Sequence, residues 1–487
     1  MGEPAQRMTR VDNAWLRMDG PTNRMLIVGV WLLEPAIGYD ALCARVQERF
    51  LRYPRFRQKV VQDAFGALWV DDPDFDLQQH VVRERLPRRR GQSARAALQQ
   101  RCGELAMTPL DPARPLWQYH LVEHYEGGSA LIMRLHHCIG DGIALVSVVL
   151  SVTDGGHTPP QLQALADPEH GDWLTRTLIH PLTGLVVKAL DLSGEGVARS
   201  IDLVANPQAR GRELARLGAR AASDLGALAL MADDSPTLLK GKPVGRKRVG
   251  WAEPIALDQV KAVGKALGAS VNDLLLACVA GAIGAHLRAR GDDPQGKEIR
   301  AMVPVNLRPP QDAYKLGNQF GLAPLVLPIG IDNPVERVYQ VRARMAELKG
   351  SLQPLFAFGV LAVAGSLNQA AQDALLGLFA RKSTAVMTNV PGPARPLTFC
   401  GSTLRQSIFW VPQTGDVAVG VSIFSYAGGV QFALISDERL CPDPQDLVER
   451  FAPEFDALTW LALMLPWGEA AAPAATRAAA ARQPAPR

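Results

Sequence analysis

Apolar runs of two kinds alternate along the first third of the chain. The run at residues 25–33 and the shorter one at 130–135 are typical of buried strands. Residues 39–50 predict a helix, and residues 143–152 are apolar enough to predict a helix inside a core. A glycine-containing turn, HHCIGDG at residues 136–142, joins the second strand to the second helix. This alternation predicts an α/β domain.

The second half of the chain returns to the same alternation. Residues Ser270 to Asp273 have the S-x-x-D form of a helix capping box. The helix that they open, LLLACVAGAIGAHL, is apolar nearly all round and is therefore expected at the centre of its domain. Strands are predicted at residues 249–255, 300–305, 321–327, 384–389, 417–423 and 430–435, and a closing helix is predicted at 445–458.

The length of the chain, 487 residues, exceeds what one hydrophobic core usually supports, so two or more domains are expected. We expect an N-terminal domain at residues 1–152 and a C-terminal domain at 249–465. Residues 153–248 are punctuated by proline and glycine and predict a helical crossover between them. Residues 466–487, dominated by Ala, Pro and Arg, predict a disordered tail.

Composition narrows the class of protein. The net charge of +4 is too small to indicate nucleic-acid binding. The 6 cysteines are scattered without a C-x-x-C pair, which favours a reducing compartment over a disulfide framework or a zinc site. The histidines outside the HHCIGDG turn have no spacing typical of metal ligands, so no metal is predicted. The first ten residues lack the apolar stretch of a signal peptide.

The longest uncharged segment covers residues 351–372. Its wholly apolar part is too short to cross a bilayer, because polar residues and a proline interrupt it. We expect a buried helix or the wall of a tunnel here, and no transmembrane segment is predicted.

The HHCIGDG turn contains the parts that general-base chemistry needs. A neutral imidazole can accept the proton of an alcohol as the alcohol attacks, and histidine titrates near working pH. Asp141 lies four residues after His137, where it can shape the loop or orient the ring, and a carboxylate suits a helix start. Gly142 leaves room for a long substrate and permits unusual backbone angles. The alternative is a histidine pair that only closes a loop.

The H-H-x-x-x-D-G pattern resembles that of the chloramphenicol-acetyltransferase-like superfamily. This superfamily includes peptide-synthetase condensation domains and the bacterial wax ester synthase/diacylglycerol acyltransferases. Further features resemble the latter family and run in its order over residues 8–460. They are VDNAWLRMDGPTNRMLIVG (11–29), Pro115-Leu116-Trp117, Asn272-Asp273, PVNLR (304–308), Gly317-Asn318, TNVPGP (388–393), and Ser425-Tyr426-x-Gly428 leading to Asp437.

The resemblance implies two chloramphenicol-acetyltransferase-like domains, each a mixed sheet with flanking helices, and a channel between them. It implies direct transfer of a long-chain acyl group from acyl-CoA to diacylglycerol or a long-chain alcohol. The resemblance further implies that no acyl-enzyme forms and that no cofactor is needed beyond acyl-CoA as co-substrate. His137 would be the proton acceptor, with His136 and Asp141 in supporting roles, and Arg308 is the expected structural partner of Asp141.

Three further parts of the sequence are candidates for the site or its surroundings. Asn272 could donate to a developing oxyanion or form the channel wall, but an asparagine at this place is also typical of helix capping. Pro115, Leu116 and Trp117 are expected to pack beneath the turn rather than to contact substrate. Gly142 is expected to lie beside the substrate.

A basic amphipathic helix is predicted within the crossover. Arg212, Arg216 and Arg220 recur on one face, opposite a leucine-rich face. Such a helix can lie on an anionic membrane or pack on its own domain. We therefore expect a cytoplasmic protein in peripheral contact with the inner face of the plasma membrane or with lipid inclusions.

Two other functions fit the same sequence. A condensation-type enzyme would take its acyl group from a carrier protein rather than from free acyl-CoA. A lipid-body coat protein would keep the fold without catalysis, although the intact H-H-x-x-x-D-G pattern argues against it. No G-x-S-x-G occurs, so a serine acyl-enzyme of the hydrolase type finds no support.

Overall fold

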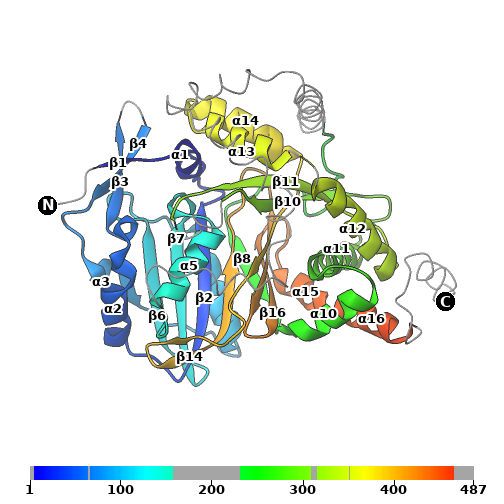
Figure 1. Ribbon diagram of the computed structural model, residues 1–487, viewed down its shortest axis with the longest axis horizontal. Helices are drawn as coiled ribbons and strands as arrows, with labels where there is room; N and C mark the ends of the chain where they lie inside the picture. The colour runs from blue at the N-terminus through cyan, green and yellow to red at the C-terminus, as the bar shows by residue number, and fades with distance from the viewer. Residues whose placement is uncertain are drawn as a thin grey trace, which may run out of the picture.

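The computed structural model describes residues 5–63, 66–156, 231–308, 315–349, 351 and 353–465. Two large sheets lie side by side, and helices cover their outer faces (Figure 1). Both sheets contain parallel and antiparallel neighbours, as the sequence predicts for a pair of mixed α/β domains. The predicted basic helix with Arg212, Arg216 and Arg220, most of the crossover and the whole tail at 466–487 lie outside the described residues.

The N-terminal sheet has the strand order β13-β14-β2-β7-β6-β5. The predicted strands at 25–33 and 130–135 are β2 and β7 at its centre, and β7 is buried along its whole length. Its strands are β2 (Leu26–Glu34), β5 (Val81–Arg83), β6 (Trp117–Tyr125), β7 (Gly128–His136), β13 (Thr398–Phe399) and β14 (Ser402–Trp410). A small separate sheet contains β1 (Gln6–Arg7), β3 (Gln58–Asp63) and β4 (Gly66–Asp71).

The C-terminal sheet has the order β11-β10-β12-β15-β16-β8, with β9 also paired to β16. Every strand predicted in this half is present. The strand predicted at 249–255 is interrupted near Pro254 and forms two pieces. The strands are β8 (Lys247–Trp251), β9 (Ile255–Ala256), β10 (Ile299–Asn306), β11 (Phe320–Leu327), β12 (Ala385–Pro391), β15 (Val419–Tyr426) and β16 (Gly429–Asp437).

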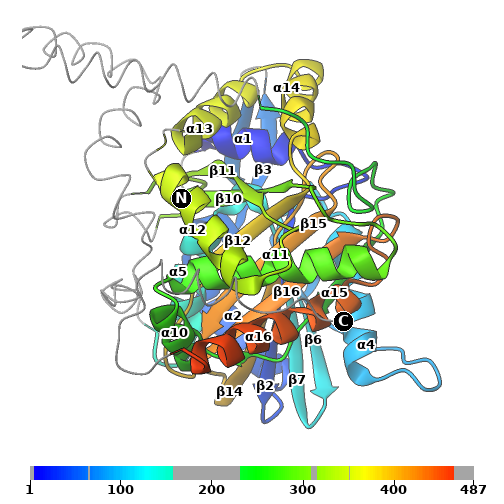
Figure 2. The same ribbon diagram turned by 90° about the vertical axis from the view of Figure 1, so that its right-hand side faces the viewer.

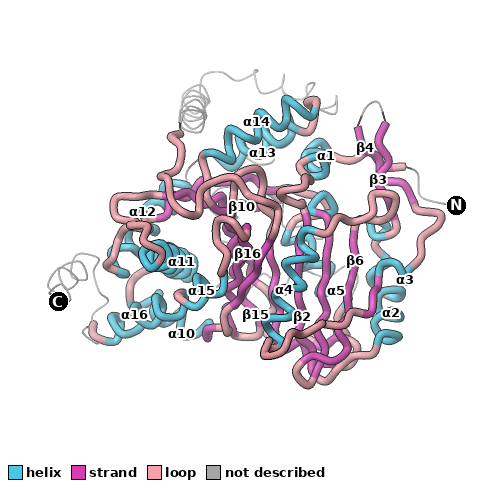
Figure 3. Tube along the Cα trace, turned by 180° about the vertical axis from the view of Figure 1, so that it is seen from behind, coloured by secondary structure: helices cyan, strands magenta, loops and turns pink. Residues whose placement is uncertain are grey.

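Helices flank the N-terminal half, and two of them, α1 (Arg10–Arg17) and α5 (Gly142–Val152), lie beside the turn that follows β7. The others are α2 (Tyr39–Glu48), α3 (Leu77–His80) and α4 (Ala94–Met107), with short 3₁₀ turns at Phe50–Arg52, Pro54–Phe56 and His137–Ile139. Seen from behind, α2 and α3 lie at one end of the molecule, and α11 and α16 lie at the other (Figure 3).

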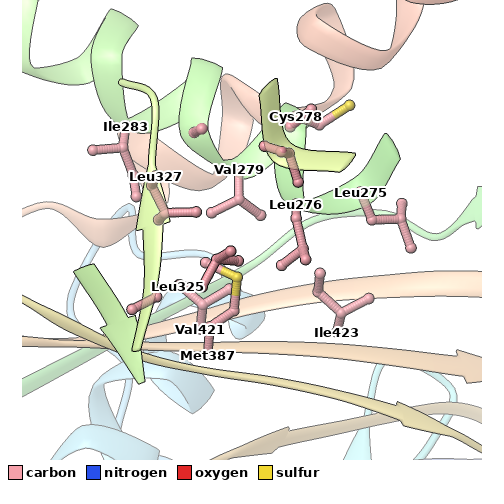
Figure 4. Packing of buried hydrophobic residues seen from close by; sticks show 14 of the residues in the cluster. Leu275, Leu276, Cys278, Val279, Ile283, Leu325, Leu327, Met387, Val421 and Ile423 are labelled. Carbon is pink, nitrogen blue, oxygen red and sulfur yellow. The ribbon is translucent and has the colours of Figure 1, made fainter. Parts of the chain in front are cut away.

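Helix α11 (Val271–Ala289) forms the core of the C-terminal half. The predicted capping box is confirmed, because Ser270 accepts a hydrogen bond from the Asp273 amide and the Asp273 carboxylate accepts one from the Ser270 amide. Leu276, Val279 and Ile283 of α11 pack toward Leu325 of β11 and the middle strands of the sheet (Figure 4). Within the described residues α11 alone has the length and hydropathy of a membrane span, and 78% of its apolar window is buried inside the protein.

The remaining helices surround α11 or lie above the sheets. Figure 2 shows α11 crossing the face of the C-terminal sheet with α16 beside it. The helix predicted at 445–458 is divided at Arg450 into two. These helices are α10 (Leu257–Ala266), α12 (Pro334–Lys349), α13 (Gln353–Ala364), α14 (Gln369–Arg381), α15 (Pro444–Glu449) and α16 (Phe451–Leu463).

The two halves are joined by more than a linker. Strand β14, from the C-terminal half of the sequence, is hydrogen-bonded along β2 in the N-terminal sheet. Helix α4 packs against both β2 and β8, and Trp251 and Trp410 meet in the apolar cluster beneath it. Residues 1–152 and 249–465 remain our proposed division of the chain, with β13 and β14 exchanged into the first domain.

Candidate active site

The HHCIGDG turn follows directly from β7, at a place where three segments meet. The His136 amide donates to the Leu116 carbonyl (2.9 Å), and the His137 amide donates to the Met25 carbonyl (2.7 Å). The His136 ring accepts a hydrogen bond at Nδ1 from the Cys138 amide (3.2 Å), which caps the 3₁₀ turn. Backbone contacts on both sides therefore fix where the second histidine points.

The His137 side chain lies in the wall of a mostly apolar cavity of about 860 Å³. This cavity lies between the two sheets, because it is lined by β2 and β7 on one side and by β10, β11 and β12 on the other. The cavity is also lined by Ala357, Val360 and Leu361 of α13. The segment at 351–372, for which a buried helix or a tunnel wall was predicted, therefore contributes to the cavity wall. His136 is buried but is not among the lining residues.

Burial determines the protonation state of both histidines. It lowers the pKa of His137 to about 4, and the ring's own backbone carbonyl, Asp141 and Asn318 oppose this only in part. It also lowers the pKa of His136 to about 4 against the opposing charge of Asp19. Both imidazoles are therefore neutral at pH 7, which is the form in which histidine accepts a proton.

Both carboxylate oxygens of Asp141 accept hydrogen bonds that stabilise the turn. One carboxylate oxygen accepts from the Ala144 amide (3.0 Å) and caps α5. The other accepts from Arg308 (2.7 Å) and from the Gln319 amide (3.1 Å). The pair with Arg308 is buried, and the sequence-based prediction that these two residues meet is confirmed. Arg308 also donates to the Gly317 carbonyl (2.6 Å), so the pair ties the turn to the segment before β11.

A second set of polar contacts, which joins Asn318 to His137 and to Asp12, was not predicted from the sequence. Asn318 donates from Nδ2 to the His137 carbonyl (2.7 Å) and to the Asp12 carboxylate (2.8 Å), and its amide also donates to Asp12 (2.9 Å). The Gly317 amide donates to the Ile139 carbonyl (3.0 Å). Gly317-Asn318 and the segment at 11–29 carried the family resemblance, but nothing in the sequence indicated that they meet at the histidine.

The other predicted site residues lie as follows. Asn272 lines the cavity and accepts from Asn389 of β12 (2.9 Å), while Ser270 rather than Asn272 caps the helix. Gly142 also lines the cavity, and a Cβ there would meet only Val390, at 3.7 Å. The wider range of backbone angles that glycine permits is not used here, because Gly142 is the first residue of α5 and does not have positive φ.

Pro115, Leu116 and Trp117 pack beneath the turn, as expected. All three are buried, and Leu116 provides the carbonyl that holds the His136 amide. The Trp117 indole donates to the Phe56 carbonyl (2.8 Å). In the part of the chain that the structure describes, no three His, Cys, Asp or Glu side chains are grouped so as to hold a metal ion.

Comparisons with known proteins identify the family of this chain. Residues 8–275 match the wax ester synthase/diacylglycerol acyltransferase catalytic domain, and residues 316–459 match the WS/DGAT C-terminal domain. The chain is 28% identical over 430 residues to "Probable diacyglycerol O-acyltransferase tgs1" of Mycobacterium tuberculosis strain H37Rv, covering 85% of this chain and 86% of that protein. It is 27% identical over 459 residues to "Probable diacyglycerol O-acyltransferase tgs2" of the same strain, covering 90% and 95%.

Solved structures share the fold. The wax ester synthase/diacylglycerol acyltransferase from Marinobacter aquaeolei VT8 superposes with a TM-score of 0.63 at 21% identity, over 94% of this chain and 100% of that chain. The first condensation domain of the calcium-dependent antibiotic synthetase gives a TM-score of 0.55 at 16% identity, over 95% and 97%. The two matched domains account for most of the chain. It is an acyltransferase and belongs to the wax ester synthase/diacylglycerol acyltransferase family.

Proposed function

We propose that this acyltransferase moves a long-chain acyl group from acyl-CoA to diacylglycerol or a long-chain alcohol, with His137 as the general base. One observation carries the proposal. The imidazole that the motif predicts is neutral through burial and lies in the wall of an apolar cavity between the two domains. Relatives named as diacylglycerol O-acyltransferases support the choice of acceptor class.

The proposed reaction has one bond-forming step at the histidine. The acceptor hydroxyl gives its proton to His137 as its oxygen attacks the thioester carbonyl carbon. The carbon–sulfur bond then breaks, and the leaving thiolate takes the proton back from His137, which gives the ester and free CoA. Cys138, beside His137, is an unsuitable nucleophile for an acyl-enzyme. Burial raises the pKa of its thiol well above the ordinary value, and it does not line the cavity.

The cavity suits two apolar substrates. Its volume of about 860 Å³ lies toward the upper end of the range of about 300–1,000 Å³ for small-molecule sites. Asn272 and Gly142 are the lining residues that we assign to substrate, the first as a donor to the developing oxyanion or as channel wall, the second as space for the chain. No cofactor beyond acyl-CoA enters the proposal.

The experiment is a substrate panel with purified protein. Palmitoyl-CoA and a palmitoylated carrier protein are each offered with diacylglycerol, hexadecanol and shorter alcohols, and the products are separated by chromatography. We expect triacylglycerol or wax ester from palmitoyl-CoA. Esterification from the carrier alone would indicate a condensation-type enzyme. Absence of product with every pair, from protein that binds lipid, would indicate a coat protein.

We further propose that the protein works in the cytoplasm, in peripheral contact with the inner face of the plasma membrane or with lipid inclusions. The end of α16 exposes three large apolar side chains, Trp460, Leu463 and Met464, which supports such contact. Cosedimentation with vesicles of phosphatidylglycerol and phosphatidylethanolamine tests it. Binding that is unchanged in Trp460→Glu/Met464→Glu would show that this helix end makes no contribution.

A further inference from the structure

Trp15 of α1 lies face to face with the imidazole of His137. The ring centroids are 4.3 Å apart and the planes are inclined by 15°. Phe320 lies 5.6 Å from the indole and 5.7 Å from the imidazole. These three separations form a triangle, so Phe320 flanks the stacked pair, and the indole covers one face of the imidazole.

Helix α1, which carries the indole, is held by contacts with other segments. Asp12 of α1 is bonded to Asn318, and Asn13 donates to the Gly365 carbonyl at the end of α13 (2.9 Å). Gln372 of α14 donates to the Ala14 carbonyl (3.1 Å). A Cβ at Gly365 would overlap the backbone of α1, so α1 and α13 are in very close contact. Helix α1 is thus held from two directions.

The proposed mechanism places a positive charge on a ring with little help from carboxylates. Asp141 is already paired with Arg308, and Asp12 accepts from Asn318. Among the described residues, His137 Nδ1 is buried without a hydrogen-bond partner of normal geometry. The titratable and charged groups around the ring are His136, Asp141 with Arg308, Asp12, and Asp19 beyond His136.

We propose that Trp15 is a positioning residue that stabilises the protonated imidazole of His137 through the face of its indole during acyl transfer. The inference rests on the proposed function, because it requires His137 to take up the proton. A cation over an aromatic face is attracted by the ring quadrupole, most strongly for tryptophan and where water is excluded. Burial, which lowers the pKa of His137 to about 4, makes protonation costly, and the indole face offsets part of that cost.

The test replaces Trp15 alone with mono-, di- and trifluorinated tryptophan by stop-codon suppression. Fluorine withdraws electron density from the indole face while nearly preserving its shape. We expect kcat to fall with each fluorine, by about tenfold over the series, with KM unchanged, because the contact strengthens only in the transition state. The same series at Trp251, which is buried, has the Arg95 guanidinium 4.9 Å from its ring centroid and does not line the cavity, is the matched control and is expected to leave kcat unchanged.

Conventional variants complete the test. Trp15→Phe keeps an aromatic face and is expected to retain more turnover than Trp15→Leu, with thermal melting used to compare their stabilities. A kcat that is flat across the fluorinated series, while His137→Gln is inactive, would overturn the role of Trp15 and leave the proposed function intact. Normal turnover in His137→Gln would overturn the proposed function itself.

Discussion

The buried pair of Asp141 and Arg308 is the contact whose removal has the most predictable cost. Arg308→Met leaves the Asp141 carboxylate buried without its charged partner, which typically costs about 3–5 kcal/mol of folding free energy. Asp141→Asn should cost less, about 1–3 kcal/mol, because asparagine still caps α5 and Arg308 keeps its bonds to the Lys315 and Gly317 carbonyls. In the double variant neither charge remains unpaired.

A double-mutant cycle measures this coupling. The free energy of unfolding is determined by chemical denaturation for the wild type, both single variants and the double variant. We expect the double variant to lose about 2 kcal/mol less unfolding free energy than the two single variants lose together, which is within the range for contacting pairs. Activity of Arg308→Met, measured where it stays folded, should fall about a hundredfold, because the pair positions the histidine turn. Losses that add to within about 0.5 kcal/mol would refute the reasoning.

Three further predictions follow from the same site. Gly142→Ala should fold with stability equal to or up to about 1 kcal/mol above the wild type, since Gly142 is helical. Its methyl group enters the cavity, so turnover should fall more for long than for short acyl chains in a palmitoyl-CoA/hexanoyl-CoA comparison, and an equal effect on both would contradict this. Asn318→Ala removes a side-chain donor to the buried Asp12 carboxylate, which keeps the backbone amide of residue 318, and it frees the His137 carbonyl. It should destabilise the fold by about 1–3 kcal/mol in thermal unfolding and lower kcat with little change in KM. The control Asn333→Ala removes an amide acceptor at the start of α12, so it should also lose about 0.5–2 kcal/mol of stability but leave kcat unchanged. The folded-state pKa of His136, about 4, lies below its unfolded value, so its stabilising contribution is complete above about pH 6.5 and is lost as pH falls toward 4. At pH 5 that loss is about 2 kcal/mol, so His136→Gln should lose correspondingly less stability between pH 7 and 5, and equal acid sensitivity would argue against a buried neutral ring.

Local signals in the sequence were sufficient for the elements that build the site. The strand at 130–135, the helix at 143–152 and the capping box at Ser270 depend on neighbours within a few residues, and all three are present. The Arg308–Asp141 contact was predicted only from the order of family motifs, since 167 residues separate its members. Local patterns give no information on which distant segments meet.

The missed features depend on packing between distant parts of the chain. Strand β14 lies along β2 because the domains exchange a strand, and alternation of apolar residues does not state which sheet a strand joins. Trp15 was noted only as part of the opening motif, and its stacking on His137 requires α1 to fold back over the turn. The sequence could not distinguish the two reasons for a glycine at position 142, room for substrate and freedom of backbone angle, and in the structure Gly142 lines the cavity from the first turn of a helix.

The central claim is that His137, and not the neighbouring histidine, accepts the proton. Single-turnover esterification of an alcohol by palmitoyl-CoA, compared between His137→Gln and His136→Gln, tests this most directly. We predict that His137→Gln slows the step by about 10²–10⁴-fold, while His136→Gln, which keeps an acceptor for the Cys138 amide and does not line the cavity, stays within about tenfold. Equal rates in the two variants, with both folded, would contradict the mechanism.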